Sequence, residues 1–92
     1  MEPGKALDWV AEYNEEALSA DGFEDAIIGI CEIFGRPNVI AYDRDKCIEI
    51  LVQRDEMAYE EAEEYFEYNV AGSWVGDNTP VYVTLVPEDS GA

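Results

Sequence analysis

The sequence predicts an α+β fold in which two to three helices pack on one face of a small antiparallel sheet. Apolar residues recur at helical spacing, and a "GRPN" turn is followed by the β-branched and aromatic run "VIAY". A later run, "VYVTLV", alternates as a strand does. Because 92 residues is the size of one domain, we expect a single domain over 1–92 with flexible ends at 1–4 and 87–92.

The first predicted helix covers residues 4–19 and is followed by a turn at Asp21-Gly22. Its stripe at helical spacing consists of Leu7, Val10, Ala11, Asn14, Ala17 and Leu18, with Trp9 and Tyr13 beside it. The next segment has two interpretations. We favour a hairpin that pairs 26–34 with 38–42, and the alternative is a helix over 24–34, because its apolar residues also fit a period of 3.6.

The second half of the chain has clearer signals. Asp43 is a good N-cap for a helix whose buried stripe contains Cys47, Ile48, Leu51 and Val52. A break at Met57-Ala58 precedes a second helix over 59–70, which we expect Gly72 to end as a left-handed cap. The run 81–86 is predicted to be a strand with Val81, Val83 and Leu85 on one side.

The charge of the chain is far from neutral. Twenty-two acidic residues against five basic ones give a net charge of −17, and residues 55–92 contain ten acids and no base. Solubility requires a magnitude of only about 2–8 in a small domain, and a larger excess destabilises the folded state by self-repulsion. Such a surface repels nucleic acid and anionic membranes, so the expected partner is a basic protein.

Several chemistries are excluded by what the sequence lacks. Without a histidine, the chain can form no Ser-His, Cys-His or metal-histidine site. Its glycines match neither a phosphate-binding loop nor a dinucleotide fingerprint. We therefore expect a protein that is not an enzyme and has no cofactor or metal. Without an export signal, we expect it in the cytoplasm of a host cell, with Cys31 and Cys47 reduced and buried.

The stretch "EMAYEEAEEYFEYN", residues 56–69, holds six glutamates and three tyrosines and no basic residue. On a helical wheel, its glutamates gather on one side, opposite Ala62, Tyr65, Phe66 and Asn69, which we expect to face the core. Five glutamates along this helix place one charge per roughly 2–2.6 Å of axis, against about 1.7 Å in duplex DNA. The spacing is compatible with mimicry of a nucleic-acid backbone.

A charge run of this kind is also typical of a solvated helix face. Glutamate forms helices well, and Glu60 and Glu61 complement the dipole of the first turn. Against that interpretation, the repelling pairs along the helix cost on the order of 1–2 kcal/mol, and no basic residue of the stretch relieves them. The two interpretations are evenly balanced from the sequence alone.

The run "YDRDKCIEILVQRDEMAYEEAEEYFEYNVAGSWVGDNTPVYV", residues 42–83, resembles a family of small phage and bacterial proteins with no established activity. This resemblance implies a phage or mobile-element origin and no particular site residues. In size, charge and lack of catalytic groups, the chain is similar to phage-encoded DNA-mimic inhibitors, anti-CRISPR proteins among them.

The sequence therefore predicts a non-enzymatic inhibitor, a monomer or homodimer, that blocks the basic nucleic-acid-binding surface of a host defence (CRISPR-type) or DNA-binding protein. The alternative is a small structural or interaction module, homodimeric in one version, whose acidity is incidental and which binds through its Trp74–Tyr82 region. The predicted partner-binding residues are Glu60, Glu63, Glu64, Glu67, Asp55, Glu56, Asp43, Asp45, Glu49 and Tyr68.

Overall fold

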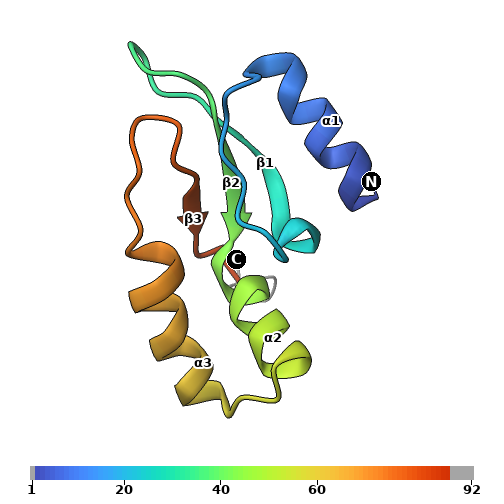
Figure 1. Ribbon diagram of the computed structural model, residues 1–92, viewed down its shortest axis with the longest axis vertical. Helices are drawn as coiled ribbons and strands as arrows, with labels where there is room; N and C mark the ends of the chain where they lie inside the picture. Colours follow the sequence, from blue (N-terminus) through green and yellow to red (C-terminus); the bar gives the residue numbers. More distant parts are fainter. Residues whose placement is uncertain (1, 88–92) are drawn as a thin grey trace.

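The computed structural model describes residues 2–87, and residues 1 and 88–92 lie outside it (Figure 1). The expected flexible ends fall mainly on these outside residues, although Pro3 and Gly4 belong to the first helix. Within the described range the elements are, in chain order, α1 (Pro3–Tyr13), the short 3-10 helix η1 (Glu24–Ala26), β1 (Ile27–Cys31), β2 (Val39–Asp43), α2 (Arg44–Arg54), α3 (Tyr59–Tyr65), the π-helix η2 (Phe66–Ala71) and β3 (Val81–Val83).

The described strands form one sheet in the order β1-β2-β3. β1 and β2 are antiparallel, with Ile30 opposite Ile40, whereas β3 runs parallel to β2, with Tyr82 opposite Tyr42. The α+β class is confirmed, but the sheet is mixed and not antiparallel throughout. The reason is a single crossover: α2, α3 and a loop carry the chain back to the start of β2, so β3 runs in the same direction as β2 (Figure 1).

The core lies on one face of this sheet. Ile40 and Tyr42 point to the same side of β2 and join a single buried cluster with residues from every helix. The other members are Val10, Phe23, Ala26, Cys47, Ile48, Leu51, Ala62 and Phe66. Tyr82 closes the cluster from β3, because its ring stacks on Tyr42 at 5.5 Å and meets Phe66 edge-on at 5.0 Å between centroids.

Helix α1 is shorter than predicted, since it ends at Tyr13 and not at residue 19. The cause is Asn14, whose side chain makes tertiary hydrogen bonds that a continuing helix would not allow. Its Nδ2 donates to the carbonyl of Asn38 and to Oδ1 of Asn78, both at 2.8 Å, and its Oδ1 accepts from the backbone N–H of Glu16 at 3.0 Å. A side chain that competes with the backbone in this way favours helix ends.

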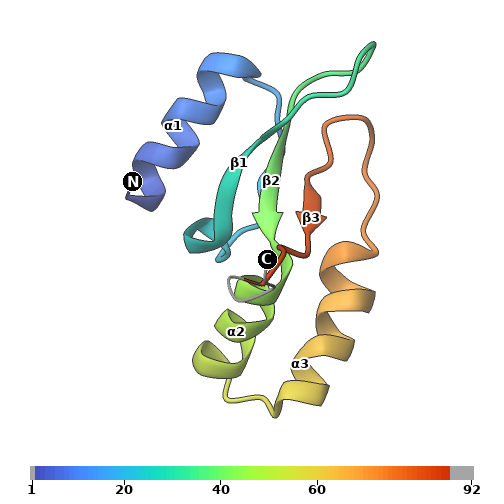
Figure 2. The same ribbon diagram turned by 180° about the vertical axis from the view of Figure 1, so that it is seen from behind.

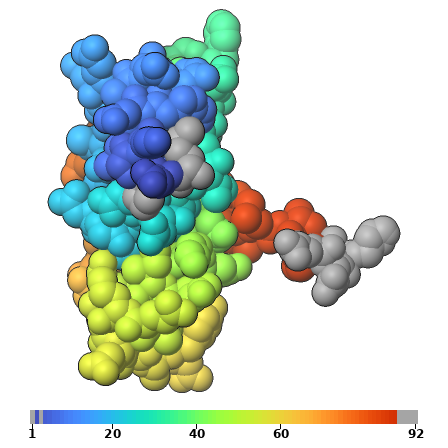
Figure 3. Space-filling model, turned by 90° about the vertical axis from the view of Figure 1, so that its right-hand side faces the viewer, coloured from blue at the N-terminus to red at the C-terminus, as the bar shows by residue number. Residues whose placement is uncertain are grey.

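The predicted hairpin of 26–34 with 38–42 is confirmed, and the alternative prediction of a helix over 24–34 is wrong. β1 ends at Cys31, so the following apolar residues Ile33 and Phe34 belong to the exposed hairpin tip. The register shifts between Ile27 and Gly29, which is a bulge that places Ile27 rather than Ile28 toward the helices. β3 is also shorter than the predicted strand, and the residues that follow it, red in Figure 3, project from the body of the molecule.

Helix α2 begins as predicted, because the side chain of Asp43 accepts a hydrogen bond from the Lys46 N–H at 3.2 Å. Its predicted stripe is buried except for Val52, which is half-buried. The expected left-handed cap at Gly72 is wrong, since Gly72 has φ −78°. Glycine is required there by close packing: a Cβ would stand 2.9 Å from the Glu67 carbonyl oxygen of the π-helix.

The two cysteines are free thiols in the described structure. Cys47 is buried in the core and Cys31 is only partly buried, so the prediction that both are buried holds for Cys47 alone. Burial raises the pKa of the Cys47 thiol to about 12. Among residues 2–87, no helix has the length and apolar character that crossing a bilayer requires.

Candidate functional site

The acidic helix is held on the body of the protein by one narrow buried stripe. Ala62 and Phe66 are fully buried, and Val70 continues the same line one turn later. α2 packs alongside, and the two helices lie side by side at the end of the molecule opposite the hairpin tip (Figures 1 and 2). The side of α3 that faces away from both this stripe and α2 is exposed.

We use the name acidic face for the outward residues Glu60, Glu61, Glu64, Tyr65 and Tyr68. Within residues 2–87, no basic side chain lies within ion-pair distance of the three glutamates. Glu61, Glu64 and the two tyrosines line a shallow groove together with Asn69. Carboxylates beside exposed aromatic rings can bind a guanidinium group by charge and by stacking.

The structure corrects the predicted orientation of this helix. Tyr65 was expected in the core but is 43% exposed, and Asn69 is exposed as well. The buried residues are spaced four apart, and from Phe66 onward the chain forms a π-helix, so a wheel of 100° per residue misplaces the later side chains. Tyr68, 77% exposed, lies on the acidic face as predicted.

Arg44 neutralises two of the glutamates predicted to bind the partner, which the sequence did not reveal. Its guanidinium pairs with Glu67 and lies 3.6 Å from the Glu63 carboxylate. It also lies 3.8 Å from Asp45 and covers the Phe66 ring at 5.7 Å. The hydrogen bond to Glu67, followed by the nearby carboxylates, raises the pKa of Arg44. Glu63 and Glu67 are thus internally paired, in contrast to the acidic face.

The predicted acids of α2 also have internal roles. Asp43 caps the helix, and Glu49 lies 3.9 Å from Lys46 and accepts a hydrogen bond from Gln53. Asp45 remains 61% exposed in its side chain even with Arg44 beside it. Asp45 and Glu49 lie on α2 and Asp43 lies directly before it, so the three residues do not extend the acidic face along α3.

The turn between α2 and α3 contains the last two predicted residues. Asp55 accepts two hydrogen bonds from Arg54, both 3.1 Å, and this pairing lowers the pKa of the Asp55 carboxyl. Arg54 also covers the buried Phe23 ring at 5.4 Å. Glu56 is exposed in the turn with a φ of 55°, a backbone conformation that few residues other than glycine adopt.

The pairing leaves a strongly negative surface. Residues 43–69 carry ten acidic and three basic residues, a net charge of −7. Because the bases are all on α2, the charge that remains without a partner is concentrated on α3. Sequence reasoning omitted Glu61 and Tyr65 from its predicted site, although the Glu61-Glu64 spacing of three residues was available as a signal.

A second exposed region lies at the other end of the molecule, where the β1–β2 hairpin tip meets the loop before β3 (Figures 1 and 2). We call Ile33, Phe34, Trp74 and Val75 the apolar end; all four are exposed, Trp74 by 66%. Ile33 and Trp74 line the same small cavity, of about 50 Å³, together with Pro37 and Val39. The apolar end is therefore built from two segments far apart in sequence.

Among the described residues, no group of three or more acidic, cysteine or histidine side chains is arranged to hold a metal ion. Comparison of the chain with protein-family models, with curated proteins and with solved structures gives no match in any of the three.

Proposed function

We propose that this chain is a non-enzymatic inhibitor that uses the acidic face of α3 to block the basic nucleic-acid-binding surface of a host protein, of the CRISPR-type defence or DNA-binding class. The proposal rests on a difference in charge pairing between two sets of glutamates along α3 and η2. Glu63 and Glu67 pair with Arg44, while Glu60, Glu61 and Glu64 point outward with no basic partner within residues 2–87. Charge maintained at a cost to stability is expected where a partner supplies the counter-charge.

The tyrosines support a protein partner rich in arginine. Tyr65 and Tyr68 line the groove with Glu61 and Glu64, so a guanidinium that enters can stack on a ring and bind a carboxylate. A surface that normally holds phosphates presents arginines of this kind. Mimicry of a nucleic-acid backbone, and not only general acidity, is therefore the specific form of the proposal.

The test is a charge reversal with a matched control. The variant Glu60→Lys, Glu61→Lys, Glu64→Lys changes the acidic face, and Glu12→Lys, Glu15→Lys, Glu16→Lys makes the same charge change at exposed positions near the end of α1. Proteins captured from a bacterial lysate by the wild type should be lost with the first variant and retained with the second. Equal retention by both variants would refute the acidic face as the binding surface.

Competition then tests mimicry itself. A captured protein is purified, and its binding to a duplex DNA or RNA oligonucleotide is measured with increasing amounts of the chain. The proposal expects the chain to displace the oligonucleotide, with an affinity that falls about tenfold or more between low and high salt. A ternary complex with oligonucleotide still bound would contradict mimicry and leave only an acidic contact.

A second candidate function has its own observation. The exposed apolar end could make this chain an interaction module, or a homodimer, whose acidity is incidental. Sedimentation at low and high salt separates the candidates, because apolar association persists when charges are screened. Concentration-dependent dimerisation that Trp74→Ser abolishes would favour the second candidate.

A further inference from the structure

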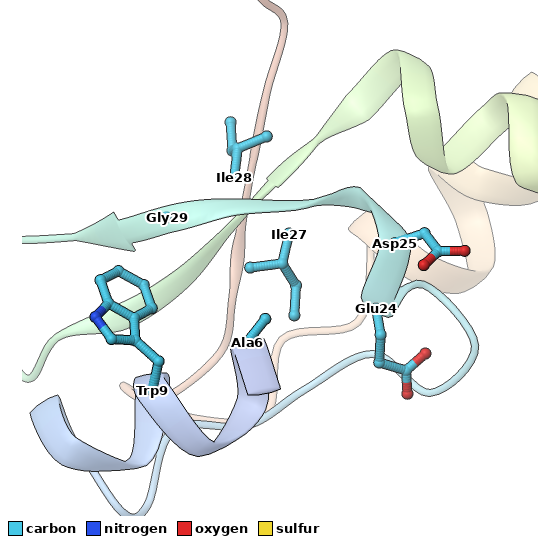
Figure 4. A pocket seen from close by; sticks show the side chains of 7 residues that line it. All are labelled: Ala6, Trp9, Glu24, Asp25, Ile27, Ile28 and Gly29. Atoms are coloured by element: carbon cyan, nitrogen blue, oxygen red, sulfur yellow. The ribbon is translucent and has the colours of Figure 1, made fainter. Parts of the chain in front are cut away.

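A groove separate from the acidic face runs between α1 and β1 (Figure 4). Ala6 and Trp9 form its helical side, and Ile27 points across it toward Ala6. Gly29 leaves space beside the strand, because a Cβ at this position would meet no atom within 4 Å. The groove thus has an apolar floor beside an open stretch of backbone.

That backbone belongs to the edge of the sheet. β1 pairs with β2 on one side, and among residues 2–87 no strand pairs with its other side. Nor does any loop or side chain in the described range hydrogen-bond to the backbone between Ile28 and Cys31 from outside the sheet. After the bulge, Gly29, Ile30 and Cys31 pair regularly with β2, so their outward N–H and C=O groups are available to another strand.

The negative charge of the groove indicates which kind of segment can bind there. Glu24 and Asp25 stand at one end of the groove (Figure 4). They also line an adjoining hollow with Gly22. The residues that line the groove include these two carboxylates and no basic side chain. A second copy of this chain would bring its own Glu24 and Asp25 to the same edge, and like charges so placed repel. A basic segment from another protein has the complementary charge.

We propose that this groove binds an extended basic segment of a partner protein, which adds as a strand to the free edge of β1. Its backbone pairs with Gly29–Cys31, an apolar side chain contacts Trp9 and Ile27, and an arginine or lysine lies at Glu24 and Asp25. The site uses α1, η1 and β1 only, so it does not depend on the function proposed for α3.

The probe is a short synthetic peptide in which arginine alternates with valine, with a glutamate-valine peptide as the charge control. Trp74→Phe leaves Trp9 as the one tryptophan of the chain, so the emission of Trp9 reports the groove. Binding of the arginine peptide should shift the Trp9 emission to shorter wavelength in a saturable manner, because a bound strand excludes water from the indole. The glutamate peptide should produce no shift.

Two further comparisons identify the mode of binding. Glu24→Gln with Asp25→Asn should weaken the arginine peptide about tenfold, while the matched pair Glu15→Gln with Glu16→Gln should change its affinity less than twofold. A peptide methylated on every backbone nitrogen should not bind, because all of its donors for strand pairing are removed.

Backbone NMR of the wild-type protein gives an independent readout. The arginine peptide should move the amide resonances of Gly29, Ile30 and Cys31. Absence of binding, resonance changes confined to α3, or equal binding of the methylated peptide would each overturn the proposal. Resonance changes confined to α3 would overturn the groove proposal but would not contradict the function proposed for that helix.

Discussion

The acidic face of α3 and the apolar end are both exposed, but they are attached to the protein in different ways. The acidic face lies directly over the core, since Ala62 and Phe66 on the same helix are fully buried. The apolar end stands away from the core cluster, on a hairpin tip and a loop that Asn14 ties together. Buried apolar side chains thus hold the acidic face in place, whereas a few hydrogen bonds hold the apolar end in place.

The largest expected effect comes from removing the anchor of the acidic face. Phe66→Ala should lower the free energy of unfolding by about 3–5 kcal/mol, because it removes a fully buried ring that contacts Tyr82 and lies under Arg44. Urea denaturation followed by circular dichroism measures the change. Tyr68→Ala, on the same helix but exposed, should cost about 0.5 kcal/mol or less; similar losses would show that α3 is not held by its buried stripe.

Alkaline pH should weaken the same anchor without changing the charge of the glutamates. Burial raises the pKa of Tyr82 to about 12, above its ordinary value of 10.0. The unfolded chain then loses this proton at lower pH than the folded chain, so the stability that Tyr82 contributes is complete below pH 10 and falls as pH rises toward about 12. Thermal unfolding at pH 8 and pH 11 should show a smaller decline for Tyr82→Phe than for the wild type. Parallel declines would contradict the assignment to Tyr82.

Substitution of Arg44 should lower the stability of the protein and raise its affinity for a basic partner. Arg44→Gln should cost about 0.5–1 kcal/mol in stability, because the pairs with Glu63 and Glu67 are partly exposed. It should also strengthen binding of a basic partner, since two more carboxylates become available. Chemical denaturation and affinity measurements on one sample test both, and weaker binding would show that Arg44 itself contacts the partner.

The smallest effect concerns the turn that joins α2 to α3. The hydrogen bonds from Arg54 hold the pKa of the Asp55 carboxyl below its ordinary 3.8. The stability from this pair is present above pH 3.8 and is lost as pH falls through the lowered value. NMR titration of Asp55 should show its midpoint move upward in Arg54→Gln, and an unchanged midpoint would mean that the pair does not persist in solution.

The sequence predicted those features that depend on neighbours in the chain. Asp43 caps α2 because a short acidic side chain reaches the N–H three residues on, and the turn at "GRPN" produces the hairpin. Features that depend on distant contacts were missed. The end of α1 is determined by Asn14 bonding to Asn38 and Asn78, and the parallel placement of β3 follows from the crossover.

The same distinction applies to the candidate site. The charge of α3 is evident from the sequence, but its partition between paired and outward glutamates depends on Arg44, which is 19 and 23 residues away from its partners Glu63 and Glu67. Asn69, which was expected to face the core, is exposed on the π-helix, which begins at Phe66 without a signal in residue type. Neither could be deduced from helical spacing.

The bonds of Asn14 also have a consequence for motion. One amide side chain joins the end of α1, the hairpin tip and the loop before β3, and the Leu18 N–H adds a bond to the Asn78 carbonyl. Segments linked through a single group open together, so the apolar end should open as one cooperative unit by local unfolding. Hydrogen exchange at Leu18, Arg36 and Thr79 should then share one opening free energy, and Asn14→Ala should raise all three rates at once.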